Sequence, residues 1–540
     1  MFTKIYKRIL KKIISEDSLP SAAVIVSITY FISALLGLFR NRILATYFGD
    51  SVELGIFYMA DKLPGLIYSL LIATTVSSAF IPIFLQHRKK SKEQANIFMS
   101  NLLNVSMVSY LLIALIVFIF SDFFCRLISW NSLDQPSIKI MSRLIKYILL
   151  SQIFLIVSTY YSTFLQSYKR FIIPAIIPIL YNFGIILGTA LFHDKFGINA
   201  PAIGMLLGSL LGVLFQLPFI IFMGFRHSFK LSIRDPGLKK ALVIIFPKAL
   251  GISVHRLYSL IIGGFIALVY SPSYLVIYEF ANQLQTMPVN AFGTSLSQAM
   301  LPTLSDYAAD NEINKVASLL KKYTLKITYF TLSITMMFFV LRIPITRLLF
   351  GGDKFSWLGT NLTAYTLAFF SISIWFQTLT VIFSKVFYSF GNSKTPTRTG
   401  VISLIISFLI SALFANILKM GVWSFALAFS IGAIINTLML YVSLSNLIGH
   451  FLKDIISDLA KISFATLLCG EVTYILLKSL DKIVFDTTRT VPLFMLTTTV
   501  VIIGLGVFIT ASEYMGISYF RNIAHRFKLK FLSNLSNTPI

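Results

Sequence analysis

Residues 57–82 read FYMADKLPGLIYSLLIATTVSSAFIP, an apolar run of membrane-spanning length that carries Asp61 and Lys62 side by side. A helix needs about 20 mostly apolar residues to cross a hydrocarbon core about 30 Å thick. A charged side chain inside such a helix costs roughly 2.5–3.5 kcal/mol, so it usually faces protein or a hydrated cavity rather than lipid. This stretch therefore predicts a membrane helix whose charged side chains serve a function.

Similar apolar segments recur along the whole chain. The 540 residues are 56% hydrophobic and 12% charged, with a mean hydropathy of +0.81, which excludes an ordinary soluble globule. We predict an all-α polytopic membrane protein with about fourteen transmembrane helices. These are expected at 21–46, 52–86, 96–120, 140–167, 171–192, 200–224, 238–270, 273–304, 320–341, 360–390, 398–418, 421–446, 456–478 and 490–513.

The basic residues behind the formal net charge of +25 are distributed according to the predicted topology. With a cytoplasmic N-terminus, the cytoplasmic segments carry about 28 Lys and Arg residues and the opposite side about 11, as the positive-inside rule requires. The basic N-terminal segment 1–20 and the basic tail 514–540 are then both cytoplasmic. We expect these segments to attract anionic membrane lipids, and we expect no nucleic-acid partner.

A weak internal repeat relates the second and eighth predicted spans. Ala-Asp-Lys-Leu at 60–63 aligns with Ala-Asn-Gln-Leu at 281–284, and a proline follows at 82 and at 302. The two copies are six spans apart, an even number, so both enter the membrane in the same direction, which predicts a pseudo-two-fold axis along the membrane normal. Two six-helix lobes are expected, at 21–224 and 238–446, with two extra C-terminal helices at 456–513.

A few cations remain inside the predicted spans after the loops and tails are set aside. Lys248 and Arg256 are eight residues apart and therefore share roughly one face of their helix. Together with Arg40 and Lys62 they are expected to line a water-accessible cavity between the lobes. Such a cavity suits an anion, because Arg can hold phosphate oxygens with two parallel hydrogen bonds. Further cavity partners are expected at Arg42, Asp61, Glu279 and Gln283.

An alternative interpretation leaves the spans without a substrate site. Arg42, Lys146 and Lys385 lie near span ends, where long cations can extend to the headgroups, and Asp61 can neutralise a nearby cation. The sequence shows neither metal-ligand spacing nor a Gly-rich loop that continues into Lys-Ser/Thr. We therefore expect no catalytic residue, no metal and no cofactor.

Short motifs recur in the order and spacing of a known family. They are LGLFR at 36–40, FG at 48–49, KLP at 62–64, AFIP at 79–82, YKRFIIPA at 168–175, Asn182, LPTLS at 301–305, FYS at 387–389 and KTP at 394–396. Over nearly the whole chain these resemble the MviN/MurJ lipid II flippases, a branch of the multidrug/oligosaccharidyl-lipid/polysaccharide exporter superfamily.

The resemblance implies a transporter rather than an enzyme. Such a flippase moves lipid II, the undecaprenyl-pyrophosphate-linked peptidoglycan precursor, across the bacterial cytoplasmic membrane for cell-wall biogenesis and cell shape. The resemblance implies that the cavity holds the pyrophosphate and the sugar headgroup, and that a groove beside the helices at 456–513 takes the polyprenyl tail. The expected partner is the lipid-linked saccharide, and the expected state is a monomer.

Several positions depart from the family pattern. Ala34, Ser69 and Gln283 stand where the family typically has Arg, and Gly55 stands where it has an acid. Arg40 and Lys62 match the family's cavity cations. Because Lys248 and Arg256 are not typical of the family, we hypothesise that they partly replace the missing positive charge.

The expected mechanism is alternating access, in which Arg40, Lys62 and Arg256 neutralise the diphosphate. Membrane potential can bias the return of the positive cavity, at roughly 2.3 kcal/mol per charge per 100 mV. Two alternatives stay open, a flippase for another lipid-linked oligosaccharide and a non-transporting membrane scaffold. A cation-coupled drug exporter is disfavoured, because the spans hold more Arg and Lys than Asp and Glu.

Overall fold

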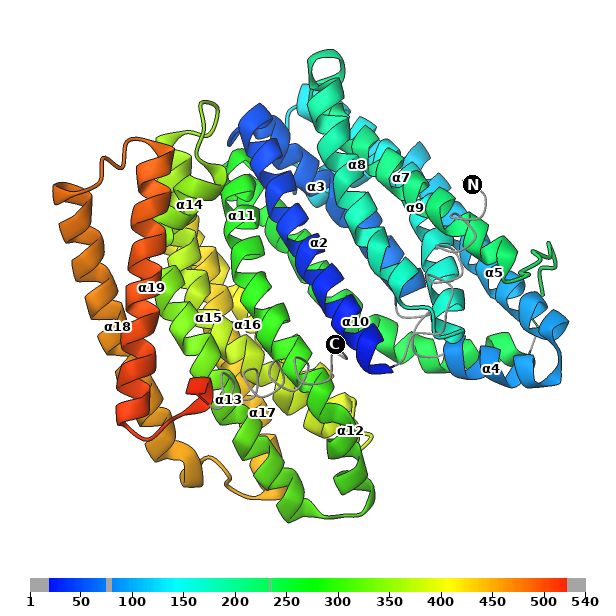
Figure 1. Cartoon of the computed structure of the whole chain (residues 1–540). Helices are drawn as coiled ribbons and strands as arrows, with labels where there is room; N and C mark the ends of the chain where they lie inside the picture. The colour runs from blue at the N-terminus through cyan, green and yellow to red at the C-terminus, as the bar shows by residue number, and fades with distance from the viewer. Residues whose placement is uncertain (1–18, 74–79, 233, 235, 522–540) are drawn as a thin grey trace, which may run out of the picture. The chain divides into compact units, whose positions relative to one another are not determined.

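The computed structural model describes residues 19–73, 80–232, 234 and 236–521, and these form helices without any strand (Figure 1). The helices that precede residue 270 are α2 (Leu19–Phe48), α3 (Val52–Tyr68), the π-helical turn η1 (Ser69–Ala73), α4 (Ile81–Lys90), α5 (Lys92–Ile119), α6 (Ser121–Ile128), α7 (Gln135–Ser167), α8 (Ile172–Phe196), α9 (Asn199–Phe222) and α10 (Pro236–Val269).

The later helices follow with short connections. They are α11 (Pro272–Pro288), the π-helical turn η3 (Val289–Thr294), α12 (Ser295–Ala309), α13 (Ile313–Val340), α14 (Arg342–Phe350), α15 (Trp357–Ser389), α16 (Lys394–Ala412), the π-helical turn η4 (Leu413–Ile417), α17 (Trp423–Ile448), the 3₁₀ turn η5 (Lys453–Ile455), α18 (Ile456–Ile483) and α19 (Thr490–Tyr514).

Membrane-length helices account for most of the described chain. Ten of them are long and apolar enough to cross a bilayer, namely α5, α7, α8, α9, α13, α15, α16 with η4, α17, α18 with η5, and α19. Helices α2 and α10 have 30 and 34 residues, which is about 45 and 51 Å of helix at 1.5 Å per residue. The predicted class, an all-α polytopic membrane protein, is confirmed.

The second and eighth predicted spans each contain a π-helical turn. Both α3 and α11 have 17 residues and pass directly into a π-helical turn, η1 or η3. The span predicted at 273–304 is helical throughout, as α11, η3 and the first part of α12, and the span predicted at 52–86 is interrupted only where residues 74–79 lie outside the described residues. Pro64 lies inside α3 and Pro288 ends α11, and a proline removes a backbone hydrogen bond and favours a bend. The matching lengths and π-helical turns agree with the sequence repeat between these two spans.

Contacts divide the chain into two compact units. One unit runs to Val276 and adds the segment Leu349–Ser356, and the other comprises Ile277–Leu348 and the chain from Trp357 onward. Helix α10 belongs to the first unit because it packs against α3 and η1. The lobes expected at 21–224 and 238–446 are defined by the repeat rather than by contacts, and they stay a prediction.

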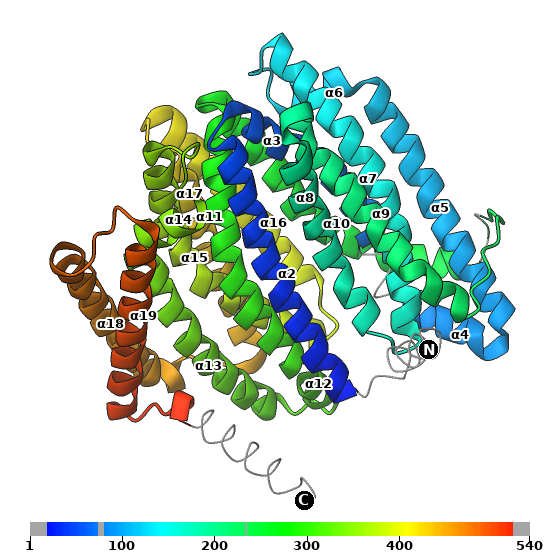
Figure 2. The ribbon, with the colours of Figure 1, turned by 45° about the horizontal axis from the view of Figure 1, so that its top comes forward.

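Small residues bring α8 and α9 together within the first unit. Gly184 and Gly188 on α8 face Gly204 and Gly208 on α9, and a Cβ added at any of the four would lie within 3.0 Å of a backbone atom of the partner helix. The two helices run side by side with α5 and α7 in both views (Figures 1 and 2). Close approach through glycine is the common way for helices to pack in lipid, where the hydrophobic effect does not drive association.

Helix α13 connects two cores within the second unit. One core joins it to α15 and α17 and includes Leu320, Phe383 and Leu440. The other joins it to α18 and α19 and includes Tyr329 and Phe508. The spans expected at 456–478 and 490–513 are thus present as α18 and α19, packed on the second unit.

Candidate functional site

Two of the predicted cavity cations meet where α3 packs against α10. Lys62 Nζ donates a hydrogen bond to Ser259 Oγ at 3.0 Å, and a Cβ added at Gly263 would lie 3.9 Å from Lys62 Cε. Arg256 has an exposed side chain, and its Nη1 lies 4.0 Å from the position that a Cβ would take at Gly65. Because Gly65 follows Lys62 by three residues, both cations lie on one side of α3.

The third predicted cation, Arg40, is held by two amide side chains within the first unit. Its Nε and Nη2 donate to Asn41 Oδ1 at 3.2 and 3.1 Å, and its Nη1 donates to Asn182 Oδ1 at 3.2 Å. Asn41 follows Arg40 on α2, whereas Asn182 comes from α8. These three hydrogen bonds fix the guanidinium through neutral oxygen atoms.

Two tyrosines connect these groups of cations. The hydroxyl of Tyr181 lies within electrostatic range of Arg40, Asp61 and Tyr68, and the hydroxyl of Tyr68 lies within range of Arg256. Arg40, Asp61 and Arg256 therefore lie near these two tyrosines, and Lys62 follows Asp61 on α3; we call these four charged side chains, with the neutral residues that bind them, the polar cluster. Helices α2, α3, α8 and α10 supply it, all from the first unit.

The remaining predicted partners lie elsewhere or outside the described side chains. Arg42 Nη1 donates to the carbonyl oxygen of Gly351, so this guanidinium is bound to the segment before α15. Glu279 and Gln283 lie on α11 in the second unit. The side chain of Lys248 lies outside the described residues. The roles expected for these side chains stay predictions.

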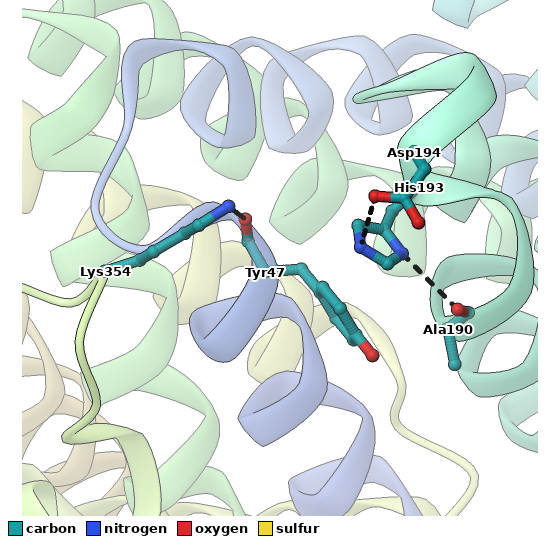
Figure 3. A network of polar contacts seen from close by, with 5 residues as sticks. All are labelled: Tyr47, Ala190, His193, Asp194 and Lys354. Carbon is teal, nitrogen blue, oxygen red and sulfur yellow. Dashed lines mark hydrogen bonds and ion pairs between the residues drawn. The ribbon is translucent and has the colours of Figure 1, made fainter.

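A second polar network holds the segment 349–356 on the end of α2 (Figure 3). Lys354 Nζ donates to the carbonyl oxygen of Tyr47 at 3.0 Å. The Tyr47 ring lies against the ring of His193, with 3.9 Å between their centroids. His193 in turn contacts the Ala190 carbonyl oxygen at 3.3 Å and an Asp194 carboxylate oxygen at 3.1 Å.

The turn between α2 and α3 binds the same segment. Asp50 accepts hydrogen bonds from the Ser356 backbone nitrogen at 3.1 Å and from its hydroxyl at 2.5 Å. Gly49 has a positive φ of +64° and leaves no room for a Cβ beside the Lys354 carbonyl. Although it joins α14 to α15, the segment therefore belongs with the first unit.

One departure from the family pattern has a packing explanation. A Cβ added at Gly55 would overlap the carbonyl group of Pro272, because α3 and the start of α11 approach each other backbone to backbone. The acid expected at this position from the resemblance has no space here. Gly55 thus allows a helix contact in place of a charge.

Two other cations of the predicted spans lie over aromatic rings. Lys146 Nζ is 5.0 Å from the ring centroid of Phe118, and Lys385 Nζ is 5.9 Å from that of Tyr388.

Across the part of the chain that the structure describes, no three His, Cys, Asp or Glu side chains are grouped so that they could hold a metal ion.

The sequence singled out Asn182 only as part of a family motif, and it did not place Asn41, Asn182 or Ser259 beside the cations. Asn41 and Asn182 have 1% and 9% of their surface exposed, and Ser259 meets Lys62 from a helix far along the chain. The available signal was an amide in an apolar run, since a buried amide without a hydrogen-bond partner is costly. That signal predicts that a partner exists but does not identify it.

Comparison with known families and relatives gives a consistent result. The family model for lipid II flippase MurJ matches residues 44–501. A probable lipid II flippase MurJ of Borreliella burgdorferi is 26% identical over 420 residues, which are 78% of this chain and 82% of the relative. The lipid II flippase MurJ of Burkholderia cenocepacia is 27% identical over 427 residues, with coverages of 76% and 81%.

Solved structures share the fold. A lipid II flippase MurJ in an inward closed conformation superposes with a TM-score of 0.75 at 24% identity, over 90% of this chain and 99% of that chain. An inward-facing multidrug resistance transporter of the MATE family gives a TM-score of 0.66 at 13% identity, with coverages of 80% and 99%.

Proposed function

Because this chain belongs to the MurJ family of lipid II flippases, we propose that it carries lipid II across the membrane that its helices span. It is a transporter and not an enzyme. A flippase must take a charged headgroup through a hydrocarbon layer while the lipid tail stays in the bilayer. The observation that carries the proposal is the cluster of Arg40, Lys62 and Arg256 on membrane helices of one unit.

The chemistry of this cluster suits a diphosphate. Guanidinium groups bind phosphate oxygens through parallel, charge-assisted hydrogen bonds. Neutral oxygens of Asn41 and Asn182 hold Arg40, and the Ser259 hydroxyl holds Lys62, so these contacts orient the cations without reducing their charge. The cluster pairs the three cations Arg40, Lys62 and Arg256 with the carboxylate of Asp61, which gives these four side chains a formal excess of positive charge.

We propose that the headgroup crosses by alternating access, and the π-helical turns that follow α3 and α11 support this. Helices α3 and α11 both pass into π-helical turns, and such interruptions allow helices to bend. In the proposed cycle the headgroup enters from the cytoplasm, Arg40, Lys62 and Arg256 neutralise the diphosphate, and the cavity then reopens outward. The cycle uses no cofactor. Membrane potential biases the return of the positive cavity, at roughly 2.3 kcal/mol per charge per 100 mV.

The polyprenyl tail is proposed to run along α18 and α19. These helices expose large apolar side chains, among them Phe464, Ile475, Phe494 and Ile502. An apolar surface of this kind lets a lipid chain stay in contact with hydrocarbon while the headgroup crosses.

The proposed setting is the bacterial cytoplasmic membrane. As a multi-pass protein of this family, the chain works there, and we propose that both termini are cytoplasmic. The basic segments 1–20 and 514–540 then face anionic lipid headgroups. The protein is proposed to act as a monomer on the undecaprenyl-pyrophosphate-linked saccharide.

Complementation tests the proposal. A bacterium depleted of its own lipid II flippase should grow when it expresses this chain and should fail with Lys62→Ala or Arg256→Ala at equal membrane levels. Lys146→Ala is the matched control, because it removes a span cation that lies over Phe118 and outside the cluster. Rescue by all four proteins would remove the cluster from the mechanism.

If the unaltered chain does not rescue growth, depleting it in its native host separates the two alternatives. If depletion in its native host makes a different lipid-linked saccharide accumulate on the inner leaflet, the chain is a flippase for that saccharide. If no lipid-linked saccharide changes leaflet on depletion, the chain is a non-transporting membrane scaffold.

A further inference from the structure

We propose that Asn182 and Asn41 are positioning residues, which set the direction of the Arg40 guanidinium so that it can receive the diphosphate of the substrate. This inference rests on the proposed function and adds two neutral residues to it. Both residues act through Arg40 rather than on the substrate. The evidence lies in the hydrogen-bond geometry, in the fixed orientation of one amide, and in the chemical difference between an amide and a carboxylate.

The guanidinium is held along two of its sides. Nε and Nη2 share one edge, and both donate to the single oxygen Oδ1 of Asn41 at 3.2 and 3.1 Å. Nη1, on another side of the group, donates to Asn182 Oδ1 at 3.2 Å. Three of the five N–H groups of Arg40 are used in this way. Fixing a flat cation at two sides determines the plane in which it lies.

The orientation of the Asn182 amide is itself determined. Its Nδ2 donates to the Pro178 carbonyl oxygen at 3.1 Å and approaches the carbonyl oxygen of Ser33 at 3.4 Å. A flipped amide would place an acceptor oxygen against these two acceptors. Oδ1 therefore points at Arg40, and α8 determines the direction of a cation carried by α2.

It matters for an anion transporter that the side chains binding Arg40 are uncharged amides. A carboxylate in place of Asn182 would also bind Arg40, but it would neutralise the charge that a diphosphate needs. Its second oxygen would in addition face the Pro178 and Ser33 carbonyl oxygens. The amide supplies the same geometry and leaves the positive charge unchanged. Both amides are buried, with 1% of Asn41 and 9% of Asn182 exposed, so the surrounding helices hold them in place beside Arg40.

A structural role is the competing explanation, in which Asn182 only joins α8 to α2. The two explanations differ in their coupling to Arg40. A joint between helices affects folding whether or not Arg40 is present, whereas a positioning residue affects ligand binding only through Arg40. A double-mutant cycle separates the two, because residues that act as a unit are not additive.

The test measures binding of undecaprenyl diphosphate to the full-length protein in lipid nanodiscs, with undecaprenol as the neutral probe. Asn182→Ala should weaken diphosphate binding about tenfold or more, because Arg40 loses one of the two contacts that set its orientation. The same change in an Arg40→Ala background should have no further effect. Asn182→Asp should bind more weakly than Asn182→Ala, because it adds a negative charge beside Arg40.

Asn101→Ala is the matched control. Asn101 is a buried amide of the same unit, 2% exposed, that bonds through Nδ2 and Oδ1 to the backbone of Ser232 and does not contact Arg40. It should leave diphosphate binding unchanged even if it lowers stability. If Asn182→Ala does not fold, Asn41→Ala is measured in the same cycle, because Asn41 holds the other edge of the guanidinium.

Each outcome has a definite meaning. Wild-type affinity in Asn182→Ala, or effects of Arg40→Ala and Asn182→Ala that simply add, would overturn the inference. The inference would also be lost if Asn182→Asp bound diphosphate as well as the wild type does. If the wild-type protein did not distinguish undecaprenyl diphosphate from undecaprenol, the proposed function itself would fail.

Discussion

Replacing Gly188 with alanine should weaken the first unit by forcing α8 away from α9. A Cβ at this position would lie 2.7 Å from the Gly204 backbone nitrogen and 3.1 Å from the Ala200 carbonyl oxygen, and closer still to Gly204 Cα. Ordinary contacts of a Cβ begin at 3.4 Å, so the first distance is short by 0.7 Å. The atoms in the way belong to the backbone of α9, so no side chain can rotate aside.

The size of the effect follows from this displacement. A gap of about 0.5–1 Å forfeits a quarter to a half of the attraction between packed atoms along the α8–α9 contact. Overpacking of a well-filled interior typically costs about 1–3 kcal/mol. Alanine also gains about 1 kcal/mol of helix propensity over glycine, which offsets part of this loss.

Gly400→Ala is the control, because it gains the same helix propensity as Gly188→Ala without a packing clash. Gly400 lies on the membrane-length helix α16, and a Cβ there would meet nothing within 4 Å. In thermal unfolding of the purified proteins, the free energy of unfolding of Gly188→Ala should be lower than that of Gly400→Ala by the packing cost, about 1–3 kcal/mol. If both substitutions shift the unfolding midpoint equally, the close glycine contact of α8 with α9 is not a determinant of stability.

Three further predictions concern charged and buried polar groups. Asp50→Ala should speed amide hydrogen exchange in 349–356 about tenfold or more, since two hydrogen bonds to the carboxylate are lost, while α18 stays unchanged. Hydrogen bonds from the first turn of α7 hold the pKa of the Asp134 carboxyl below its usual range. The resulting stabilisation is present above about pH 4 and is lost as the pH falls through the lowered folded-state pKa. When the free energy of unfolding is measured at a series of pH values, Asp134→Asn should therefore lose less stability on acidification than the wild type. Ser69→Arg should lower the unfolding midpoint, and by less when Arg256 is alanine.

The sequence predicted the helices well because hydropathy and length are local properties. Ten predicted spans correspond to membrane-length helices, and α18 and α19 lie where two extra helices were expected. The π-helical turns after α3 and α11 were not predicted, because Pro64 and Pro288 are compatible with either a kink or a smooth bend. Which of these forms depends on the helices packed around the turn.

The candidate site was predictable in its charges and not in its partners. Arg40 and Lys62 stand out as costly charges in apolar runs, and that cost is a property of the sequence. Their partners Asn182 and Ser259 are 142 and 197 residues away, and neutral side chains carry no comparable signal. Contacts of this kind are determined by helix packing, which composition and periodicity do not specify.

The geometry around Arg256 bears on the hypothesis that it replaces a missing family cation. Ser69 follows Gly65 by four residues, so it lies about one turn further along the face of α3 that Arg256 approaches. Ser69 is 3% exposed and donates to the Leu66 carbonyl oxygen at 2.9 Å, which leaves little space for a long side chain. The cation therefore reaches this region from α10 and not from α3. An arginine at position 69 would add a like charge near Arg256, so the two substitutions should be coupled. If the effects of Ser69→Arg and Arg256→Ala on the unfolding midpoint simply add, Arg256 does not occupy the place of the missing arginine.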